Sequence, residues 1–418
     1  MKSVACAFSV LILAACGGGG GSEIAGGSNE IKKAAQAFSA SSLDNIADSE
    51  LAAFGNAVGD KKIVVLTEPT HGVAQALDLN ARLIRYLHEQ KGFDVLLIES
   101  GLFDVVNMNE LKQSRAIPFT QSAPGRTYYG FSRDAHGQKI FAYVDQTQKT
   151  SKPLSLAGIE VMMEGVASTG LFVSRLEARL QARNASLLRD PEWQTYKVIA
   201  QRLTSNPEYT DAPVELPAFK RVQELVKAEF CTAPASQESH FESDGFWCRA
   251  VHSLSGTMGY VWSKPKQLDY NERGFVAGHN AAWLIDRPFA GKKVIVLTHA
   301  LHGFAAGSEL KTSTGKVLAD RYPGQIHTSH ITASKVFDPN EATVKGTLEF
   351  ELDQLGQFAY MSYPADAATR NLLQGSSVRE VNFVPQTPNR FGSAYQSLFY
   401  VRQVNFTTPD WSGYPTIY

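Results

Sequence analysis

The sequence predicts an α/β fold in which a largely parallel central sheet is flanked by helices on both faces and interrupted by a helical insertion. Short apolar runs rich in β-branched residues indicate buried strands at 62–67, 94–98, 154–159 and 293–298. Stretches with the apolar spacing of helices alternate with these runs, at 73–90, about 135–148 and about 268–286. Fully apolar strands that alternate with helices are typical of a parallel sheet covered on both faces.

The pattern changes in the middle of the chain and again after it. Between about 161 and 265, helical spacing continues without strands, which predicts the helical insertion. Further strands are expected at about 325–332, 346–352, 357–362 and 397–404, and the later ones alternate in the manner of antiparallel edge strands. Residues 41–418 are therefore predicted to form one α/β domain that contains the insertion.

The first sixteen residues, MKSVACAFSVLILAAC, indicate a targeting signal rather than a part of the fold. One Lys precedes an apolar run that is too short to span a bilayer, and small residues come before Cys16. LAAC resembles the bacterial lipoprotein box, which predicts a signal peptide at 1–15, lipidation of Cys16 and a flexible tether at 16–40. An ordinary secretory signal is the alternative. With Gly17 after the Cys, we expect a lipid anchor in the outer membrane of the cell envelope, facing the periplasm.

Composition limits the partners and the redox chemistry. The chain of 418 residues is 44% hydrophobic and 19% charged, which is an ordinary globular composition. Its 40 Lys and Arg against 41 Asp and Glu give no net field that would attract nucleic acid. In an oxidising compartment, Cys231 and Cys248 predict a disulfide. A metal site or catalytic thiol with His240 and His252 as neighbours is the alternative.

Acidic and imidazole side chains follow three of the expected strands. They are Glu68 and His71 after the first strand, Glu99 after the second, and His299 and His302 after the strand at 293–298. Open α/β sheets bind ligands outside the carboxyl ends of their strands. Two carboxylates and three imidazoles at one rim therefore predict a functional site there.

The same residues lie in motifs that resemble those of the erythromycin esterase family. TEPTHG at 67–72 resembles the GE-x-THG signature, and HALH at 299–302 resembles the WAHN-x-H motif that follows a strand. RGFVAGHNAAWL at 273–284 is similar to the family's RD-x-x-MA-x-N-x-x-WL helix and places Arg273 and Asn280 in register. The resemblance spans most of the mature chain. It implies the family's fold and a hydrolase that acts on a small-molecule carboxylic ester or lactone.

Departures from the family pattern concern the substrate. Asn80 stands where the macrolide esterases of the family carry an Arg on the inner face of the first helix. Gly274 replaces an Asp, and Ala300 replaces the Asn of the AHN motif. Arg273, Asn80 and Asn280 are the candidate substrate-binding residues. The motifs do not name the substrate, so a macrolide and a role in antibiotic resistance stay open.

The resemblance implies hydrolysis by a water molecule that His71 activates. A neutral imidazole titrates near working pH and contributes on the order of a hundred- to ten-thousandfold as a general base. Glu68 or Glu99 would fix its tautomer, while His299 and His302 would stabilise the oxyanion or protonate the leaving group. The chain has no G-x-S-x-G elbow, which argues against a covalent serine route.

Two other functions could use the same five residues at the strand ends. Glu-x-x-His, His-x-x-His and a second Glu could hold a divalent metal in a metal-dependent hydrolase or protease. A non-enzymatic lipoprotein could instead bind haem or a similar ligand through one histidine. The preferred reaction needs no cofactor. His327 and His330 repeat the His-x-x-His spacing, but they point to opposite faces of a strand, so at most one of them lines the site.

Overall fold

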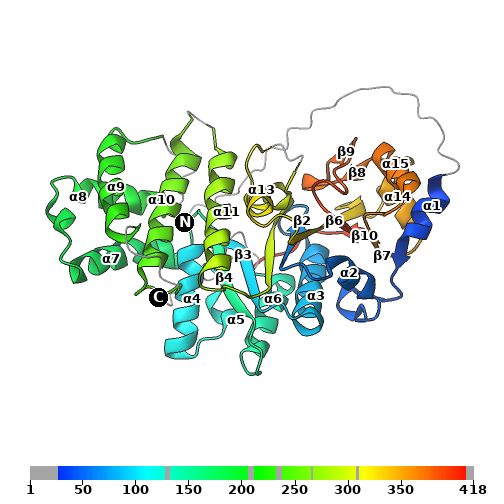
Figure 1. The fold of residues 1–418 in the computed structure, drawn as a ribbon, viewed down its shortest axis with the longest axis horizontal. Coiled ribbons are helices and arrows are strands. Elements are labelled where there is room, and N and C mark those ends of the chain that lie inside the picture. Colours follow the sequence, from blue (N-terminus) through cyan, green and yellow to red (C-terminus); the bar gives the residue numbers. More distant parts are fainter. Residues whose placement is uncertain are drawn as a thin grey trace.

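The computed structural model describes residues 27–127, 132–205, 211–231, 238–264, 267–306 and 310–410. The predicted signal peptide, Cys16 and the first part of the tether lie outside the described residues. A sheet in the order β1-β7-β10-β6-β2-β5-β3-β4 runs through the centre of the molecule (Figure 1). Its strands are β1 (Ala35–Ala37), β2 (Ile63–Glu68), β3 (Val95–Gly101), β4 (Ser155–Glu160), β5 (Val294–His299), β6 (Ile326–Val336), β7 (Phe358–Ser362) and β10 (Ser397–Val404).

Helices precede, separate and follow these strands. They are α1 (Gly27–Ala34), α2 (Ala52–Val58), α3 (Ala74–Lys91), α4 (Leu102–Arg115), α5 (Phe119–Ser122), α6 (Ala135–Thr147), α7 (Val166–Ala182), α8 (Trp193–Leu203), α9 (Leu216–Cys231), α10 (Asp244–Trp262), α11 (Tyr270–Asp286), α12 (Ala300–Gly303), α13 (Thr314–Arg321), α14 (Leu348–Asp353) and α15 (Ala367–Gly375). A small ribbon of β8 (Val378–Arg379) and β9 (Pro385–Gln386) lies beside α14 and α15 (Figure 1).

The sheet is largely parallel, as the sequence predicts. Neighbouring strands from β10 through β6, β2, β5 and β3 to β4 pair in parallel. Antiparallel pairing is confined to one edge, where β7 pairs with β10 and β1 pairs with β7. The strand expected at 397–404 is present as β10. Its predicted position at the edge of the sheet is wrong, because β10 lies between β6 and β7.

Both faces of the central strands are buried, so alternate residues of one strand enter different cores. Ile63 and Val65 of β2 pack in the core that contains α7 to α11. Val64 and Leu66 of the same strand pack in the core that contains α2, α3 and α6. This two-sided burial explains why β2 has no polar alternation. It confirms the expected arrangement of helices on both faces of the sheet.

Helices α7 to α10 follow one another without an intervening strand and gather beyond β4, at one end of the molecule (Figure 1). Their core is rich in aromatic rings, among them Phe172, Phe246 and Trp247. The predicted disulfide is formed between Cys231 at the end of α9 and Cys248 of α10. None of the described helices combines the length and the apolarity that crossing a membrane requires.

One expected strand is a helix. The segment expected as a strand at about 346–352 forms α14, although its Leu and Phe residues alternate with acids. Thr347 caps this helix, because its side chain accepts a hydrogen bond from Phe350 N at 3.2 Å. Leu348 and Leu352 are spaced one helical turn apart and are both buried in a third core beside β7 and β10. The cap and this packing decide between two periodicities that a six-residue segment cannot separate.

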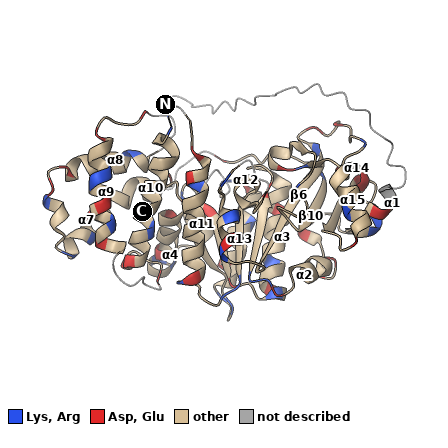
Figure 2. Ribbon diagram, turned by 45° about the horizontal axis from the view of Figure 1, so that its top comes forward, with Lys and Arg blue, Asp and Glu red and all other residues tan. Residues whose placement is uncertain are grey.

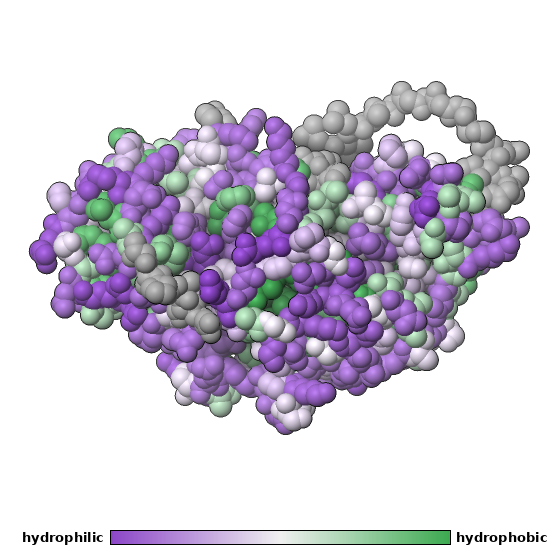
Figure 3. All heavy atoms as spheres, viewed as in Figure 1, coloured by the Kyte–Doolittle hydropathy of each residue, from purple (hydrophilic) through white to green (hydrophobic). Residues whose placement is uncertain are grey.

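Basic and acidic residues are mixed over the described helices in the view of Figure 2. Lys and Arg alternate with Asp and Glu over the helices at both ends of the molecule (Figure 2). The face in Figure 3 is mostly hydrophilic, and its hydrophobic residues reach the surface in small groups. This distribution agrees with the near balance of acidic and basic residues in the sequence.

Candidate active site

The strand ends that carry the predicted residues are neighbours in the sheet. β5 lies between β2 and β3, and Glu68 at the end of β2 pairs in register with His299 at the end of β5. Glu99 lies near the carboxyl end of β3, on the other side of β5. Residues more than two hundred positions apart in the sequence therefore meet at one edge, where an open α/β sheet binds its ligands.

The loop between β2 and α3 places His71 above this edge. Gly72 has φ +73°, in the left-handed region that favours glycine. The loop carbonyls accept hydrogen bonds from two distant segments, because Asn382 N donates to Pro69 O at 2.7 Å and Thr407 N donates to Gly72 O at 2.7 Å. Contacts from the end of the chain thus fix the loop that carries the imidazole.

His71 contacts both predicted carboxylates. Its Nδ1 lies 3.2 Å from Glu68 Oε2, and its Nε2 lies 4.0 Å from Glu99 Oε1. Its side chain is 19% exposed, whereas those of Glu68 and Glu99 are 1% and 3% exposed. Burial lowers the pKa of His71, but the hydrogen bond with Glu68 and the charges of Glu99 and Glu68 outweigh burial and raise the pKa above its ordinary value. Glu68 is thus the residue that orients His71.

Glu68 is buried beneath this imidazole. Burial raises its pKa, while the hydrogen bond and charge of His71 act in the opposite direction. Its Oε1 has no hydrogen-bond partner among the residues that the structure describes. Asp134, which caps α6 through hydrogen bonds from His136 N and Gly137 N, also raises the pKa of Glu68 through its charge. The sequence favours a solvated turn for Asp134, because it follows no expected strand, whereas the structure buries it at the start of α6.

Glu99 is held ionised at the centre of the site. Its Oε2 accepts hydrogen bonds from Thr298 Oγ1 at 2.7 Å and His299 N at 2.6 Å, and its Oε1 accepts one from Arg273 at 2.9 Å. Burial by itself would raise the pKa of Glu99, but the charges that the neighbouring histidines carry when protonated and the charge of Arg273 outweigh it and hold the pKa well below its usual range. A permanent negative charge therefore lies beneath the imidazoles.

His299 and His302 complete the group. The ring centroids of His71 and His299 are 4.7 Å apart, and those of His299 and His302 are 6.2 Å apart. Burial, followed by the charge of His71, lowers the pKa of His299 well below its ordinary value, so this ring is neutral. Leu301 N donates to His299 Nδ1 at 3.3 Å, which assigns the ring proton to Nε2.

His302 is buried under the same edge. Its Nε2 lies 3.9 Å from Glu99 Oε1, and its ring stacks with Tyr270 at a centroid distance of 6.2 Å. Burial and the charge of Arg273 lower the pKa of His302 to about 3. The site therefore contains two neutral imidazoles and one, that of His71, whose basicity is raised.

Arg273 lies below Glu99 and joins it to a second carboxylate. Its guanidinium donates to Glu160 Oε2 from Nε at 2.9 Å and from a terminal nitrogen at 2.8 Å. Glu160 also accepts from Val161 N at 2.6 Å through its other oxygen. The motifs predict Arg273 to be a substrate-binding residue, and they do not include Glu160. The strand-end rule identifies Glu160, because it directly follows the strand expected at 154–159.

The two asparagines predicted to bind substrate are buried. Asn280 donates to Ile159 O at 3.1 Å and to Ser253 Oγ at 2.8 Å, which ties α11 to β4 and α10. Asn80 on α3 is 1% exposed, and its Nδ2 has no hydrogen-bond partner among the described residues. The hydrogen bonds of Asn280 give it a role in helix packing. Asn80 has no hydrogen bond with the histidines among the described residues.

The donor atoms at the strand ends do not fit a divalent cation in this arrangement. Both carboxylate oxygens of Glu99 already accept hydrogen bonds, Oε2 from Thr298 and His299 and Oε1 from Arg273, so the guanidinium of Arg273 already balances the charge of Glu99. Among the described residues, a compact set of metal-ligand atoms occurs at Cys231, Cys248 and His252, where the cysteines are joined in a disulfide. The two histidines of the strand at 326–336 lie apart from the site: His327 contacts Ser397, and His330 contacts Thr67 from the other face.

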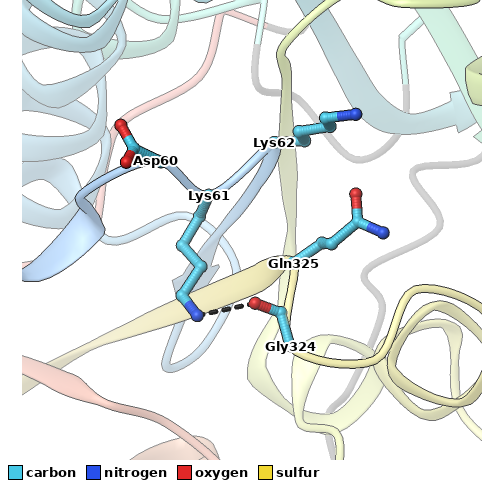
Figure 4. Close-up of a pocket in the computed structure, with 5 residues that line it drawn as sticks. All are labelled: Asp60, Lys61, Lys62, Gly324 and Gln325. Atoms are coloured by element: carbon cyan, nitrogen blue, oxygen red, sulfur yellow. Dashed lines mark hydrogen bonds between the residues drawn. The ribbon is translucent and has the colours of Figure 1, made fainter.

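A pocket lies at the opposite end of the sheet. A cavity of about 410 Å³ is lined by Lys61 and Lys62 before β2 and by Gly324 and Gln325 before β6 (Figure 4). Lys61 Nζ donates to Gly324 O across it at 2.6 Å. A cavity of about 20 Å³ lies beside Glu99. The large pocket is therefore separate from the histidine site, because the two lie at opposite ends of β2.

The chain is similar in sequence to a protein whose name describes a hydrolase. No protein-family model matches the chain. A Bacillus subtilis (strain 168) protein named "Putative hydrolase YbfO" is 24% identical over 288 residues, which cover 65% of this chain and 62% of that protein. The match thus spans less than two thirds of the relative's length.

Solved structures match over nearly the whole chain. A Bacillus cereus protein superposes with a TM-score of 0.69 at 16% identity and covers 91% of this chain and 98% of its own. A succinoglycan biosynthesis protein gives 0.70 at 13% identity, covering 91% and 97%. A mutant of erythromycin esterase EreC in its open conformation gives 0.65 at 15% identity, covering 88% and 97%. The chain has the erythromycin esterase fold. The resemblance that the motifs predicted is confirmed at the level of the fold.

Proposed function

We propose that this protein, with its erythromycin esterase fold, is a hydrolase that cleaves a carboxylic ester or lactone with water activated by His71. One observation carries the proposal: His71 combines partial exposure with a hydrogen bond to a buried carboxylate, 4.7 Å from a neutral imidazole. A base needs solvent or substrate on one side and an orienting acceptor on the other. The names of two matched proteins, a hydrolase and an esterase, support the same reaction class.

The reaction follows from the proton positions. Glu68 accepts the Nδ1 proton of neutral His71, so the basic lone pair lies on Nε2. Nε2 takes a proton from water while the water oxygen forms a bond to the carbonyl carbon. The carbonyl electrons move to oxygen, and the Nε2 proton of His299 stabilises that oxyanion. When the oxyanion collapses, the ester C–O bond breaks, and His71 returns its proton to the leaving alkoxide.

The test compares the full-length protein with two histidine variants on a panel of esters and lactones that includes macrolides, with and without a chelator. We expect His71→Ala to lower kcat on the order of a hundredfold or more, because the general base is lost. The control His240→Ala removes an exposed histidine outside the site and should leave kcat unchanged. Activity lost on chelation and restored by a divalent metal would overturn the metal-free route. A Soret band on haem addition, with no ester cleavage, would favour the binding protein.

We also propose that Cys16 carries a lipid that anchors the enzyme in the outer membrane. The support is the LAAC sequence and the Gly-rich segment after it. Membrane fractionation of cells that express the native protein and Cys16→Ser tests it directly. The native chain should sediment with the outer membrane, and the variant should remain soluble in the periplasm. Equal distribution of both proteins would contradict the anchor.

A further inference from the structure

A pocket in the helical part of the molecule has no connection with the histidine site. Its walls are the end of α9, the start of α10, the end of α11 and α13, which follow one another in this order across Figures 1 and 2. Its volume of about 300 Å³ falls within the range of small-molecule sites. The disulfide between Cys231 and Cys248 forms part of the lining and ties the α9 wall to the α10 wall.

The charged residues that line this pocket are predominantly basic. Arg249, Arg287 and Arg321 face a single acid, Asp286, which leaves a formal charge of +2 (3 − 1). Asp286 is already engaged, because one carboxylate oxygen accepts from Arg321 Nε at 2.8 Å and the other from Tyr322 Oη at 2.8 Å. Asp286 is therefore not the counterion of Arg249 or Arg287.

Neither Arg249 nor Arg287 has a side-chain acceptor within the part of the chain that the structure describes. Arg249 is half-buried, and burial lowers its pKa with no opposing carboxylate. The nearby acids are occupied, since Asp244 pairs with Arg183 at 2.8 Å. A partly buried cation without a counterion is unfavourable unless an anion from solution satisfies it.

The pKa of His252 is also affected by the positive charge of Arg249. It lies against the disulfide in the cluster that Cys231 and Cys248 form with it. Burial, and then the charge of Arg249, lower the pKa of His252 to about 4. His252, which lies outside the lining, therefore stays neutral at physiological pH, and the positive formal charge of the lining belongs to its arginines.

The rest of the lining is apolar or aromatic. Phe230 at the end of α9 and Ala282 of α11 are buried, and Trp283 of α11 is half-buried. Guanidinium groups bind planar oxyanions in a bidentate manner, and an aromatic ring offers a face for an apolar body. We propose that this pocket binds a small organic anion, through an oxyanion group held by Arg249 and Arg287 and an apolar part packed on Trp283 and the disulfide.

The test measures binding to the purified full-length protein by titration calorimetry. The probes are phenyl phosphate and benzoate, which separate a phosphate from a carboxylate preference, and benzyl alcohol, which is the uncharged control. We expect binding of at least one anion, no binding of the alcohol, and an affinity about tenfold or more weaker in Arg249→Gln. The matched control Arg189→Gln removes an exposed arginine elsewhere in the helical part and should bind as the native protein does.

Arg287→Gln provides a second variant at an exposed position, in case Arg249→Gln does not fold. Its affinity for the anion should fall as well, while ester hydrolysis by both variants stays at the native rate. Equal affinities in the native protein and both arginine variants would overturn the proposal, as would binding of benzyl alcohol as tight as that of the anions. Absence of binding by both anions at low salt would overturn it too. None of these outcomes depends on whether His71 catalyses hydrolysis.

Discussion

His71 differs from the other two imidazoles of the site because its ring forms a hydrogen bond with a carboxylate, that of Glu68. His299 and His302 are buried and neutral, whereas the hydrogen bond to Glu68 raises the basicity of His71. A stronger base takes a proton from water more readily, but it is also protonated over a wider pH range. The structure thus predicts both a role and a pH dependence for one residue.

We expect kcat/KM to rise with pH through an apparent pKa above 6.5, the ordinary value for histidine, because the proposed base His71 can accept a proton only when deprotonated and its pKa is raised. Glu68→Gln removes the charge and weakens the hydrogen bond, so the rising limb should move to lower pH. The limiting kcat should fall on the order of a hundredfold, because the imidazolium loses its stabilising partner. The pH profiles of both proteins measure this.

Glu89→Gln is the control for that measurement, since it removes an exposed acid from the same helix, α3. Its profile should superimpose on that of the native enzyme. A Glu68→Gln profile with an unchanged midpoint would show that Glu68 does not set the pKa of the catalytic base.

Glu160 is the positioning residue that the sequence analysis missed. It holds Arg273 with two hydrogen bonds while the same guanidinium contacts Glu99. We expect Glu160→Gln to lower kcat about tenfold with KM nearly unchanged, because a small displacement of Arg273 and Glu99 misplaces the reacting groups. Steady-state kinetics give the two parameters separately. Glu160→Asp, which keeps the charge, should recover part of kcat.

The control for Glu160 is another arginine-bound acid outside the site. Glu110 accepts two hydrogen bonds from Arg175, at 2.9 and 2.7 Å. Glu110→Gln should leave kcat and KM at native values. A loss confined to KM in Glu160→Gln would instead indicate that Glu160 acts on substrate binding.

At the scale of elements, the loop after β2 is held in place by backbone conformation and by the end of the chain. Gly72 in this loop and Gly92 at the end of α3 have similar positive φ angles, +73° and +69°. An added Cβ meets Thr407 Oγ1 at 3.6 Å at the first position and nothing within 4 Å at the second. Both Gly→Ala changes therefore impose mainly backbone strain.

We expect Gly72→Ala and Gly92→Ala each to lower the free energy of unfolding by about 1 kcal/mol, because alanine is disfavoured at positive φ. Only Gly72→Ala should lower kcat, by about tenfold, since its strain can relax by moving His71. Chemical denaturation and kinetics on both variants separate the two effects. Equal kcat values in the two variants would contradict a role for the loop conformation in catalysis.

Element prediction succeeded where periodicity and packing agree. The strands that become β2, β3, β4 and β5 lie close to their expected positions because both of their faces are buried, and a run of apolar residues records that. The strand prediction for the segment that forms α14 is wrong, because Leu, Phe and Leu at alternate positions also fit a helix whose Leu residues are one turn apart. Burial chose the helix, and local pattern could not.

At the scale of the whole molecule, the near-neutral charge has a kinetic consequence. With 40 basic and 41 acidic residues, the protein has no net field to steer a substrate. We expect kcat/KM for an uncharged ester to change less than about twofold between low salt and about 0.5 M salt. Anion binding at the pocket of Arg249 and Arg287 should weaken over the same range. A steep salt dependence of ester hydrolysis would point to a charged substrate or a local field at the site.

The sequence by itself determined the fold class and the five residues at the strand ends, because apolar runs and the residues that follow them are local features. Only the tertiary structure decided that β5 lies between β2 and β3, which brings Glu68, Glu99 and His299 together. It also decided that Arg273 binds Glu99 and Glu160 rather than remaining available to a substrate. Strand order and ion-pair partners depend on contacts between segments far apart in the chain, and no local pattern of residues encodes them.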